Sequence, residues 1–463
     1  MSIGVPFKFS YQNQKVYIQR LVSILTMLNG AKTEEMYPFK ERLLITILAV
    51  LGSYIEWYDY FIAATAASLV WGDVFFSAYP SLATAFSISA FGVAYFTRPI
   101  GAYIWGHVGD KYGRKSSMIY TLLTVSIGML GITVLPSSYS IGIIAPILLF
   151  TFRSIQGIGF GGEYGGAATW VLETNAKSKW RGTWTSSVMS AVGLGGGTGA
   201  GIFLYLEHTV SRAALLSFWW RIPFLIGTIL LVVAGIIRYY ALESNIFIKL
   251  QKAGKVLKNP ANAVIKKQIG IILLLATAWL YIYWVNPATI QLFAVPYLTH
   301  LHIANAAIYV TYAIFISDFI IAFTTILGGF LSDLIGRRST IIVSALGVAI
   351  LIYPYLYLIK TGIFINILLA TILLNGLAFI GEGSFTAFFP EIYNTNVRYS
   401  GSGLSYQFSA FYMGFIYTFA LPLILISSYV EIYMIIITLL FVALALIVRL
   451  RTFEETKNLD LSI

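Results

Sequence analysis

The chain has 463 residues, of which 58% are hydrophobic and only 11% are charged. Because soluble domains are typically about 45–50% apolar and about 25% charged, this composition excludes a soluble globular protein and predicts a membrane protein with many helical spans. There is no cysteine and there are four scattered histidines, so we expect no disulfide, no metal site and no cofactor.

Long apolar runs, separated by glycine, proline and charged residues, predict an all-α membrane protein with twelve transmembrane helices. A span of the bilayer core needs about 20 apolar residues, and each run is of that order. The expected spans lie at about 43–70, 81–105, 117–135, 141–172, 183–206, 218–240, 268–298, 304–330, 340–359, 363–390, 402–426 and 428–448.

The net charge of +11 is concentrated in the connections on one side of these spans. With the N-terminus inside, 25 of the 30 lysines and arginines fall in cytoplasmic connections or tails, a pattern typical of membrane topology rather than of nucleic-acid binding. We expect a multi-pass protein of the cell membrane with both termini cytoplasmic. The predicted parts are an N-terminal segment at 1–42 with a short interfacial stretch at 16–28, a six-helix bundle at 43–240, a linker at 241–267, a second six-helix bundle at 268–448 and a tail at 449–463.

Two charged segments occur twice in the chain. "GHVGDKYGRKSS" (106–117) matches "GGFLSDLIGRRST" (328–340) at an offset of 223 residues, and "ETNAKSKWRG" (173–182) matches "EIYNTNVRYSG" (391–401). The offset equals six helices plus the linker, so we expect two pseudo-symmetric six-helix bundles. Parallel repeats of this kind are typical of secondary transporters, whose substrate site lies near the middle of the membrane between the repeats.

The repeated pattern, together with "EWYDYF" (56–61), "RPIGAYIWGHVGDKYGRK" (98–115), "RSIQGIGFGGEYGG" (153–166) and "WRIPFLIG" (220–227), resembles the major facilitator superfamily and, within it, the metabolite:proton symporter family. The resemblance implies the major facilitator fold and transport of organic acids, proline, betaines or related solutes. It also implies that the repeated charges form cytoplasmic bridges that hold the outward-facing state; solvated loop charges are the alternative. These gating candidates are Asp110, Arg114, Glu173, Arg181, Asp333, Arg337, Glu391 and Arg398.

Charged residues inside the spans are costly and usually face a cavity or a pathway. Glu56 and Asp59 are three residues apart and share one helix face. Helical rise places Arg98 near the depth of Glu56, and Arg153 near that of Asp59. We expect Asp59 to carry the coupling proton, Arg153 to modulate it, and Glu56 with Arg98 to support them. Permanent ion pairs that only fix helix packing are the alternative.

The remaining intramembrane polar residues are candidates for binding a substrate. The "GIGFGG" run lies inside a span without a preceding strand, so it favours close helix packing over nucleotide binding. The substrate-binding candidates are Arg98, Arg153, Gln156, Glu163, Asn286, Gln291, Asp318, Glu382, Tyr406 and Gln407.

Together these features predict a secondary active transporter, not an enzyme, that imports a small polar metabolite by proton symport and alternating access. We expect a monomer whose partners are the solute, protons and the lipid bilayer, with no nucleic acid. A facilitator or a proton-driven antiporter of the same fold, for a sugar or another small solute, is the nearest alternative. A channel or a transport-derived sensor is disfavoured because a channel needs no repeated gate and a sensor usually carries a soluble output domain.

Overall fold

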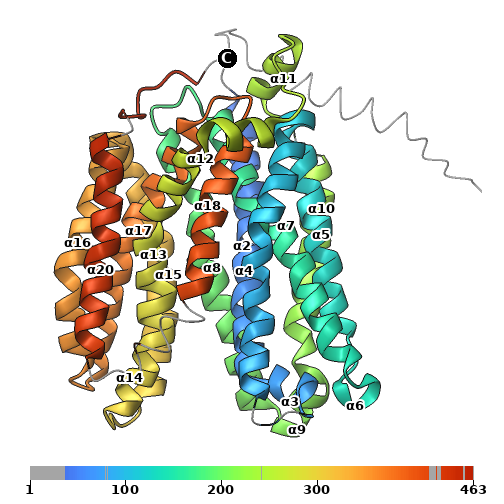
Figure 1. Ribbon diagram of the computed structural model, residues 1–463, viewed down its shortest axis with the longest axis vertical. Helices are drawn as coiled ribbons and strands as arrows, with labels where there is room; N and C mark the ends of the chain where they lie inside the picture. The colour runs from blue at the N-terminus through green and yellow to red at the C-terminus, as the bar shows by residue number, and fades with distance from the viewer. Residues whose placement is uncertain are drawn as a thin grey trace, which may run out of the picture. The chain divides into compact units, whose positions relative to one another are not determined.

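The computed structural model describes residues 37–461 apart from 79, 81, 241, 417–423, 425–428 and 452–453, and the predicted stretch at 16–28 lies outside these residues. Every regular element in this part of the chain is helical (Figure 1). The first half consists of α2 (Phe39–Leu69), α3 (Trp71–Phe75), α4 (Ala83–Tyr112), α5 (Arg114–Val134), α6 (Ser138–Ile141), α7 (Ile144–Thr174), α8 (Arg181–Thr209), α9 (Arg212–Ala214), the π-helix η1 (Leu215–Trp219) and α10 (Arg221–Tyr239).

The second half follows a connection that contains one short helix, α11 (Asn245–Lys252). It consists of α12 (Pro260–Ala278), α13 (Leu280–Tyr283), the π-helix η2 (Trp284–Phe293), α14 (Ala294–His300), α15 (Ala306–Ile335), α16 (Arg337–Ile359), α17 (Phe364–Ile392), α18 (Arg398–Phe415) and α20 (Val430–Arg451). The elements from α12 to α14 follow one another directly, so they form the single predicted span at 268–298.

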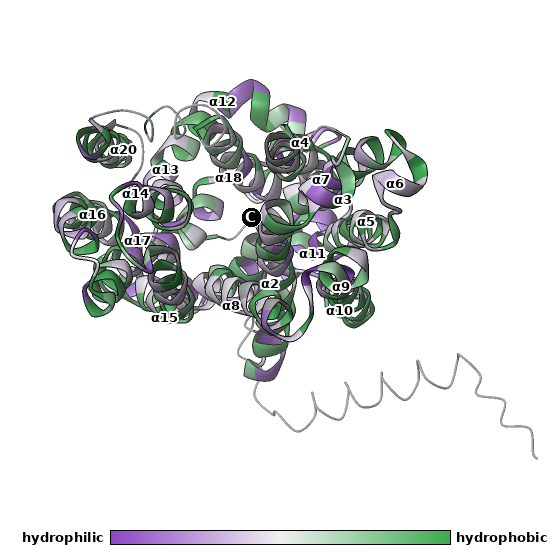
Figure 2. Cartoon of the chain, turned by 90° about the horizontal axis from the view of Figure 1, so that it is seen from below, coloured by the Kyte–Doolittle hydropathy of each residue, from purple (hydrophilic) through white to green (hydrophobic). Residues whose placement is uncertain are grey.

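Eight helical stretches in the described part of the chain are long and apolar enough to cross a membrane. With α2, α4, α18 and α20 they make up the twelve predicted spans. The outward sides of these helices carry large exposed apolar residues, such as Ile236 on α10, Phe323 on α15 and Ile350 on α16. Figure 2 shows hydrophobic residues predominating on α5, α10 and α15. In a bilayer such faces contact lipid, so their exposure is expected.

The two halves meet through glycine-rich faces of α4 with α18 and of α8 with α15. A Cβ atom added at Gly193 of α8 would lie only 1.9 Å from the carbonyl oxygen of Asp318 on α15. One added at Gly165 of α7 would lie 2.7 Å from the Cα atom of Gly403 on α18. Small residues therefore permit close approach between the halves, whereas Gly157 and Gly161 of the predicted GIGFGG run pack against α4 of their own half.

We call the end of the bundle that carries α11 the linker end. Figure 1 shows the ribbons of the two halves converging at this end and separating towards α14 and α3. The segment at 106–116, predicted to be a connection, is mostly helical, because α4 continues to Tyr112 and α5 begins at Arg114. Gly113, with φ +120°, and its repeat equivalent Gly336, with φ +99°, make these sharp turns, and such φ values favour glycine.

Candidate functional site

A buried cluster in the first half joins Asp59 of α2 to Arg153 and Gln156 of α7. Nη1 of Arg153 donates to Oδ2 of Asp59 at 3.0 Å, and Nε2 of Gln156 donates to Oδ1 at 2.9 Å. Nη1 of Arg153 also donates to Oε1 of Gln156 at 2.7 Å. The guanidinium lies over the rings of Trp71 and Phe91. Both oxygens of the Asp59 carboxylate are therefore satisfied, and the acid and base expected at one depth are in contact.

A second buried pair lies beside the first. Nη1 of Arg98 donates to Oε1 of Glu56 at 2.9 Å. The Arg98 guanidinium lies 5.2 Å from the ring centroid of Tyr95 and also interacts electrostatically with Tyr283 and Tyr406 of the second half. The Glu56–Arg98 pair thus borders the other half of the molecule.

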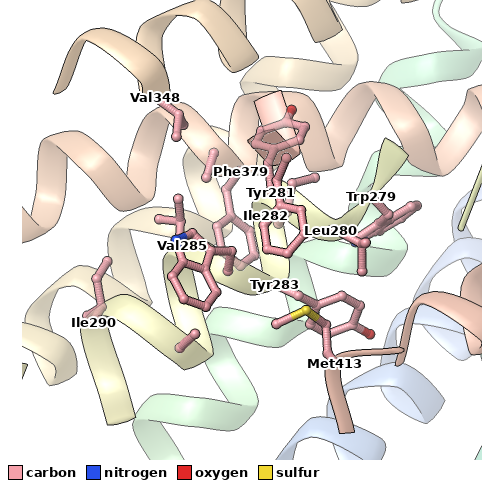
Figure 3. Packing of buried hydrophobic residues seen from close by; sticks show 14 of the residues in the cluster. Trp279, Leu280, Tyr281, Ile282, Tyr283, Val285, Ile290, Val348, Phe379 and Met413 are labelled. Carbon is pink, nitrogen blue, oxygen red and sulfur yellow. The ribbon is translucent and has the colours of Figure 1, made fainter. Parts of the chain in front are cut away.

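A small cavity lies between the halves near this pair. Figure 3 shows Trp279, Tyr283 and Phe379 within the buried cluster that forms part of its wall. In this conformation the cavity has a volume of about 10 Å³, about the room that one water molecule needs. Its lining residues are Trp57, Val192, Trp279, Ile282, Tyr283, Asn286, Phe379, Glu382 and Tyr406.

Three of the predicted substrate-binding residues therefore line this cavity, namely Asn286, Glu382 and Tyr406. Asn286 also donates to Asn375 at 3.0 Å, which holds it against α17. Gln407 lies outside the lining and donates to the carbonyl oxygen of Phe160, which joins α18 to α7 across the halves. The side chain of the remaining candidate in this region, Gln291, lies outside the described residues.

Glu163, another predicted substrate-binding residue, does not line this cavity and is instead paired within the first half. Its carboxylate accepts from Arg238 of α10 at 2.6 Å and from Thr121 of α5 at 3.1 Å, and all three groups are buried. Ten residues of helix separate Glu163 from Arg153, which turns the two side chains roughly 80° apart around α7. Arg238 was not among the predicted site residues, so the sequence did not reveal this pair.

Asp318 of α15 is also absent from the cavity lining, but it lies at the boundary between the halves. Its side chain is buried, and a Cβ atom added at Gly196 of α8 would lie 2.7 Å from Oδ2 of Asp318. Among the described atoms, Oδ1 of Asp318 has no hydrogen-bond partner. Among the described residues, this buried acid therefore has no basic partner.

At the linker end, the first repeated charge set spans the two halves. Asp110, at the end of α4, accepts from the backbone N–H groups of Tyr399 and Ser400 in the first turn of α18, at 3.1 and 2.8 Å. Glu173, at the end of α7, pairs with Arg398 of α18 at 3.0 Å and with Arg114 at 3.2 Å. A carboxylate at a helix N-terminus is favourable because it meets unpaired N–H groups and the positive end of the helix dipole.

The second charge set repeats this arrangement with the halves exchanged, so that acids of the second half bind groups of the first. Asp333, at the end of α15, accepts from the backbone N–H groups of Gly182 and Thr183 in α8, at 2.9 and 2.8 Å. Glu391, at the end of α17, pairs with Arg181 of α8 at 2.7 Å and with Arg337 at 3.0 Å. Each half therefore holds a helix N-terminus and an arginine of the other half, and we call the two sets together the gate.

Two pairs of gate residues were missed by the sequence analysis. After α10, Glu243 accepts from the backbone N–H groups of Arg114 and Lys115, and Ser244 donates to Glu173 at 2.5 Å. Burial raises the pKa of Glu243, although the backbone N–H group of Ser244, the charge of Arg114 and the backbone N–H group of Lys115 oppose the shift.

After α20, Glu455 accepts from the backbone N–H groups of Arg337 and Arg338, and Thr456 donates to Glu391 at 2.5 Å. The sequence does contain a sign of these two pairs, because Glu-Ser at 243–244 recurs as Glu-Thr at 455–456, each time after the last helix of a half.

Comparison with known proteins identifies the family. Residues 45–272 match the family described as "Sugar (and other) transporter". The "Inner membrane metabolite transport protein YhjE" of Escherichia coli K12 is 33% identical over 81% of this chain and 86% of its own length. The chain belongs to the major facilitator superfamily of transporters. A solved structure of that superfamily, the proton:xylose symporter XylE bound to 6-bromo-6-deoxy-D-glucose, has the same fold, with a TM-score of 0.70 at 17% identity over 89% of this chain and 95% of that one.

Two further relatives of this major facilitator protein transport different solutes, as their names state. The "Shikimate transporter" of Escherichia coli K12 is 30% identical over 78% of this chain and 83% of its own length. The "Proline/betaine transporter" of the same strain is 30% identical over 80% of this chain and 76% of its own length. The chain is therefore a membrane transporter of small solutes and not an enzyme, as the sequence predicted.

Proposed function

We propose that this transporter imports a small polar metabolite together with protons, by alternating access. The observation that carries the proposal is the buried pair of Asp59 and Arg153, in which both carboxylate oxygens are hydrogen-bonded. A buried carboxylate is stable without a proton only while such partners are in place. A movement that withdraws Arg153 would leave Asp59 to take up a proton, which couples the proton to the conformational change.

The gate supports alternation between two states. Its four inter-half contacts, made by Asp110, Glu173, Asp333 and Glu391, all lie at the linker end. If the linker is cytoplasmic, as the positive-inside pattern predicts, this conformation is closed to the cytoplasm. Rocking of one half against the other would break these contacts and open the inner side. Because one chain supplies both sides of the gate, we propose a monomer as the functional unit.

Flux into proteoliposomes tests the coupling. Radiolabelled shikimate, L-proline and glycine betaine are offered under an inward proton gradient, an outward gradient and equal pH. We expect an inward gradient to drive accumulation of a solute by the unsubstituted chain. In Asp59→Asn, accumulation should be lost, while exchange of that solute at equal pH is retained. The matched control is Asp73→Asn, since Asp73 is exposed and lies in a surface pair with Arg212.

The alternatives predict other results. A facilitator would equilibrate its solute without accumulation under any gradient. An antiporter would accumulate its solute only under the outward gradient. Accumulation by Asp59→Asn at the rate of the unsubstituted chain would remove Asp59 from the proposed role.

A further inference from the structure

Glu382 is a buried carboxyl group without an ionic partner at the boundary between the halves. It lies on α17 and is only 2% exposed, and its Oε2 has no hydrogen-bond partner among the described atoms. The indole of Trp279 interacts with the group, but no described arginine, lysine or histidine forms an ion pair with it. A buried carboxylate is costly unless a cation or a proton compensates its charge. Positive charge is therefore favoured at this position.

Aromatic rings surround the same carboxyl group. Trp57, Trp279, Tyr283 and Tyr406 line the cavity with Glu382. The ring centroids of Trp279 and Tyr406 are 4.9 Å apart, with the planes nearly perpendicular. Ring faces attract ammonium groups, and the attraction is strongest where water is excluded. A cationic nitrogen gains from both the rings and the carboxylate, whereas an organic anion is repelled by Glu382 when that group is ionised.

A positive group also lies near the two tyrosines. Tyr283 and Tyr406 each interact electrostatically with both Glu382 and Arg98. Nη1 of Arg98 is bound to Glu56, but Nε of Arg98 has no partner among the described atoms. The transporter thus presents a carboxyl group and a guanidinium, each with an unused hydrogen-bonding atom, around one aromatic wall.

We propose that the transported solute is a small zwitterion, whose cationic nitrogen binds Glu382 among the rings of Trp57, Trp279 and Tyr406 and whose carboxylate faces Arg98. This inference rests on the proposed function, because it takes the cavity to be the transport site. Sequence similarity does not decide the matter, since the shikimate and proline/betaine transporters are both 30% identical to this chain. With a volume of about 10 Å³ in this conformation, the cavity must widen before the solute enters.

Equilibrium binding to the full chain, purified in detergent, tests the inference. Three probes of similar shape differ in charge: glycine betaine carries both charges, choline has a hydroxymethyl group in place of the carboxylate, and tert-butylacetate has a carbon atom in place of the cationic nitrogen. L-Proline is a second zwitterion, and shikimate and xylose represent acids and sugars. Binding is followed by tryptophan fluorescence, because Trp57 and Trp279 line the cavity. No proton gradient is present, so failure of the binding test is distinct from failure of the coupling test on Asp59.

We expect glycine betaine or L-proline to bind at least about ten-fold more tightly than choline and tert-butylacetate. Glu382→Gln should lower that affinity by about ten-fold or more, and Asp73→Asn should leave it unchanged. Tighter binding of shikimate or xylose than of both zwitterions would overturn the inference, and so would equal binding of a zwitterion by Glu382→Gln. If Glu382→Gln does not fold, the three shape-matched probes still test the inference on the unsubstituted chain, because equal binding of glycine betaine, choline and tert-butylacetate would overturn it.

Discussion

Removal of one charge from the gate should open the linker end. Glu173 accepts from Arg398 at 3.0 Å, from Arg114 at 3.2 Å and from Ser244 at 2.5 Å, and it is 3% exposed. In Glu173→Gln, Arg114 keeps Asp110 as a partner. Arg398, however, loses its one described carboxylate and keeps only neutral acceptors, namely the amide oxygen of the new side chain and backbone carbonyl groups.

The size of the effect follows from the burial of Arg398. Removal of one partner of a buried pair costs about 3–5 kcal/mol. In the open state Arg398 reaches water, so the cost falls on the closed state alone. Since each 1.4 kcal/mol is about a factor of ten, the ratio of open to closed molecules should rise by roughly a hundred- to several-thousand-fold, until the open state predominates.

Thiol labelling measures this ratio, because the chain contains no cysteine of its own. Ser402 of α18 is fully buried and its hydroxyl lies 3.4 Å from that of Thr169 on α7 in the other half. A Ser402→Cys reporter should therefore react with a maleimide only when the gate opens. We expect Glu173→Gln to raise its labelling rate at least about fifty-fold. Asp73→Asn, which removes an exposed pair, should change it by less than about five-fold.

An unchanged labelling rate in a folded Glu173→Gln protein would refute this reasoning. It would mean that Glu173 contributes equally to the open and the closed states, or that α7 and α18 do not separate during opening. Thermal unfolding of both reporter proteins in detergent establishes that the substitution has not simply unfolded the chain.

Two further substitutions test the remaining buried charges. Glu163→Gln leaves Arg238 without a charged partner and should destabilise the protein by about 3–5 kcal/mol. The double substitution with Arg238→Leu should recover part of this loss. Thermal unfolding measures both effects, and an unchanged melting temperature in Glu163→Gln would contradict the prediction. Glu455→Gln removes a carboxylate that accepts from the first N–H groups of α16. The closed state should lose roughly 1 kcal/mol of stability, so labelling of the Ser402→Cys reporter should become about five-fold faster. Glu243→Gln is the equivalent change at α5, and no effect from either would exclude a role in the gate.

The number and limits of the spans could be predicted because hydropathy is a local property of the chain. The bilayer requires a run of apolar residues in each span, and most predicted limits lie within a few residues of the observed helices. Three helices extend further beyond the predicted limits: α12 begins at Pro260 rather than 268, α15 continues to Ile335 rather than 330, and α4 continues to Tyr112 rather than 105, through a segment rich in charge. Asp110 of α4 and Arg114 at the start of α5 are buried in contacts with each other and with α7 and α18, and this tertiary pairing cannot be seen in a local pattern.

The pairing of intramembrane charges was predictable only where depth alone determines it. Arg153 and Asp59 lie at similar heights on neighbouring helices, and a count of residues along each span places them together. The pair of Glu163 with Arg238 also depends on the rotation of α7 and on the position of α10, neither of which a residue count supplies. The same holds for Glu173, whose partner is Arg398 of the other half and not Arg181, eight residues along the chain.

The described intramembrane acids of the first half are paired with arginines, whereas those of the second half are not, and this difference bears on where the solute binds. Each described intramembrane acid of the first half has an arginine partner from the same half, so that half is electrostatically complete without a ligand. In the second half, Asp318 and Glu382 each keep a carboxyl oxygen without a hydrogen-bond partner among the described atoms. A cation or a proton that binds there removes a large cost, whereas one that binds in the first half must first displace an arginine. The cationic nitrogen of the proposed zwitterion should therefore bind first to the second half, and the Asp59–Arg153 pair of the first half should respond only when the halves move together.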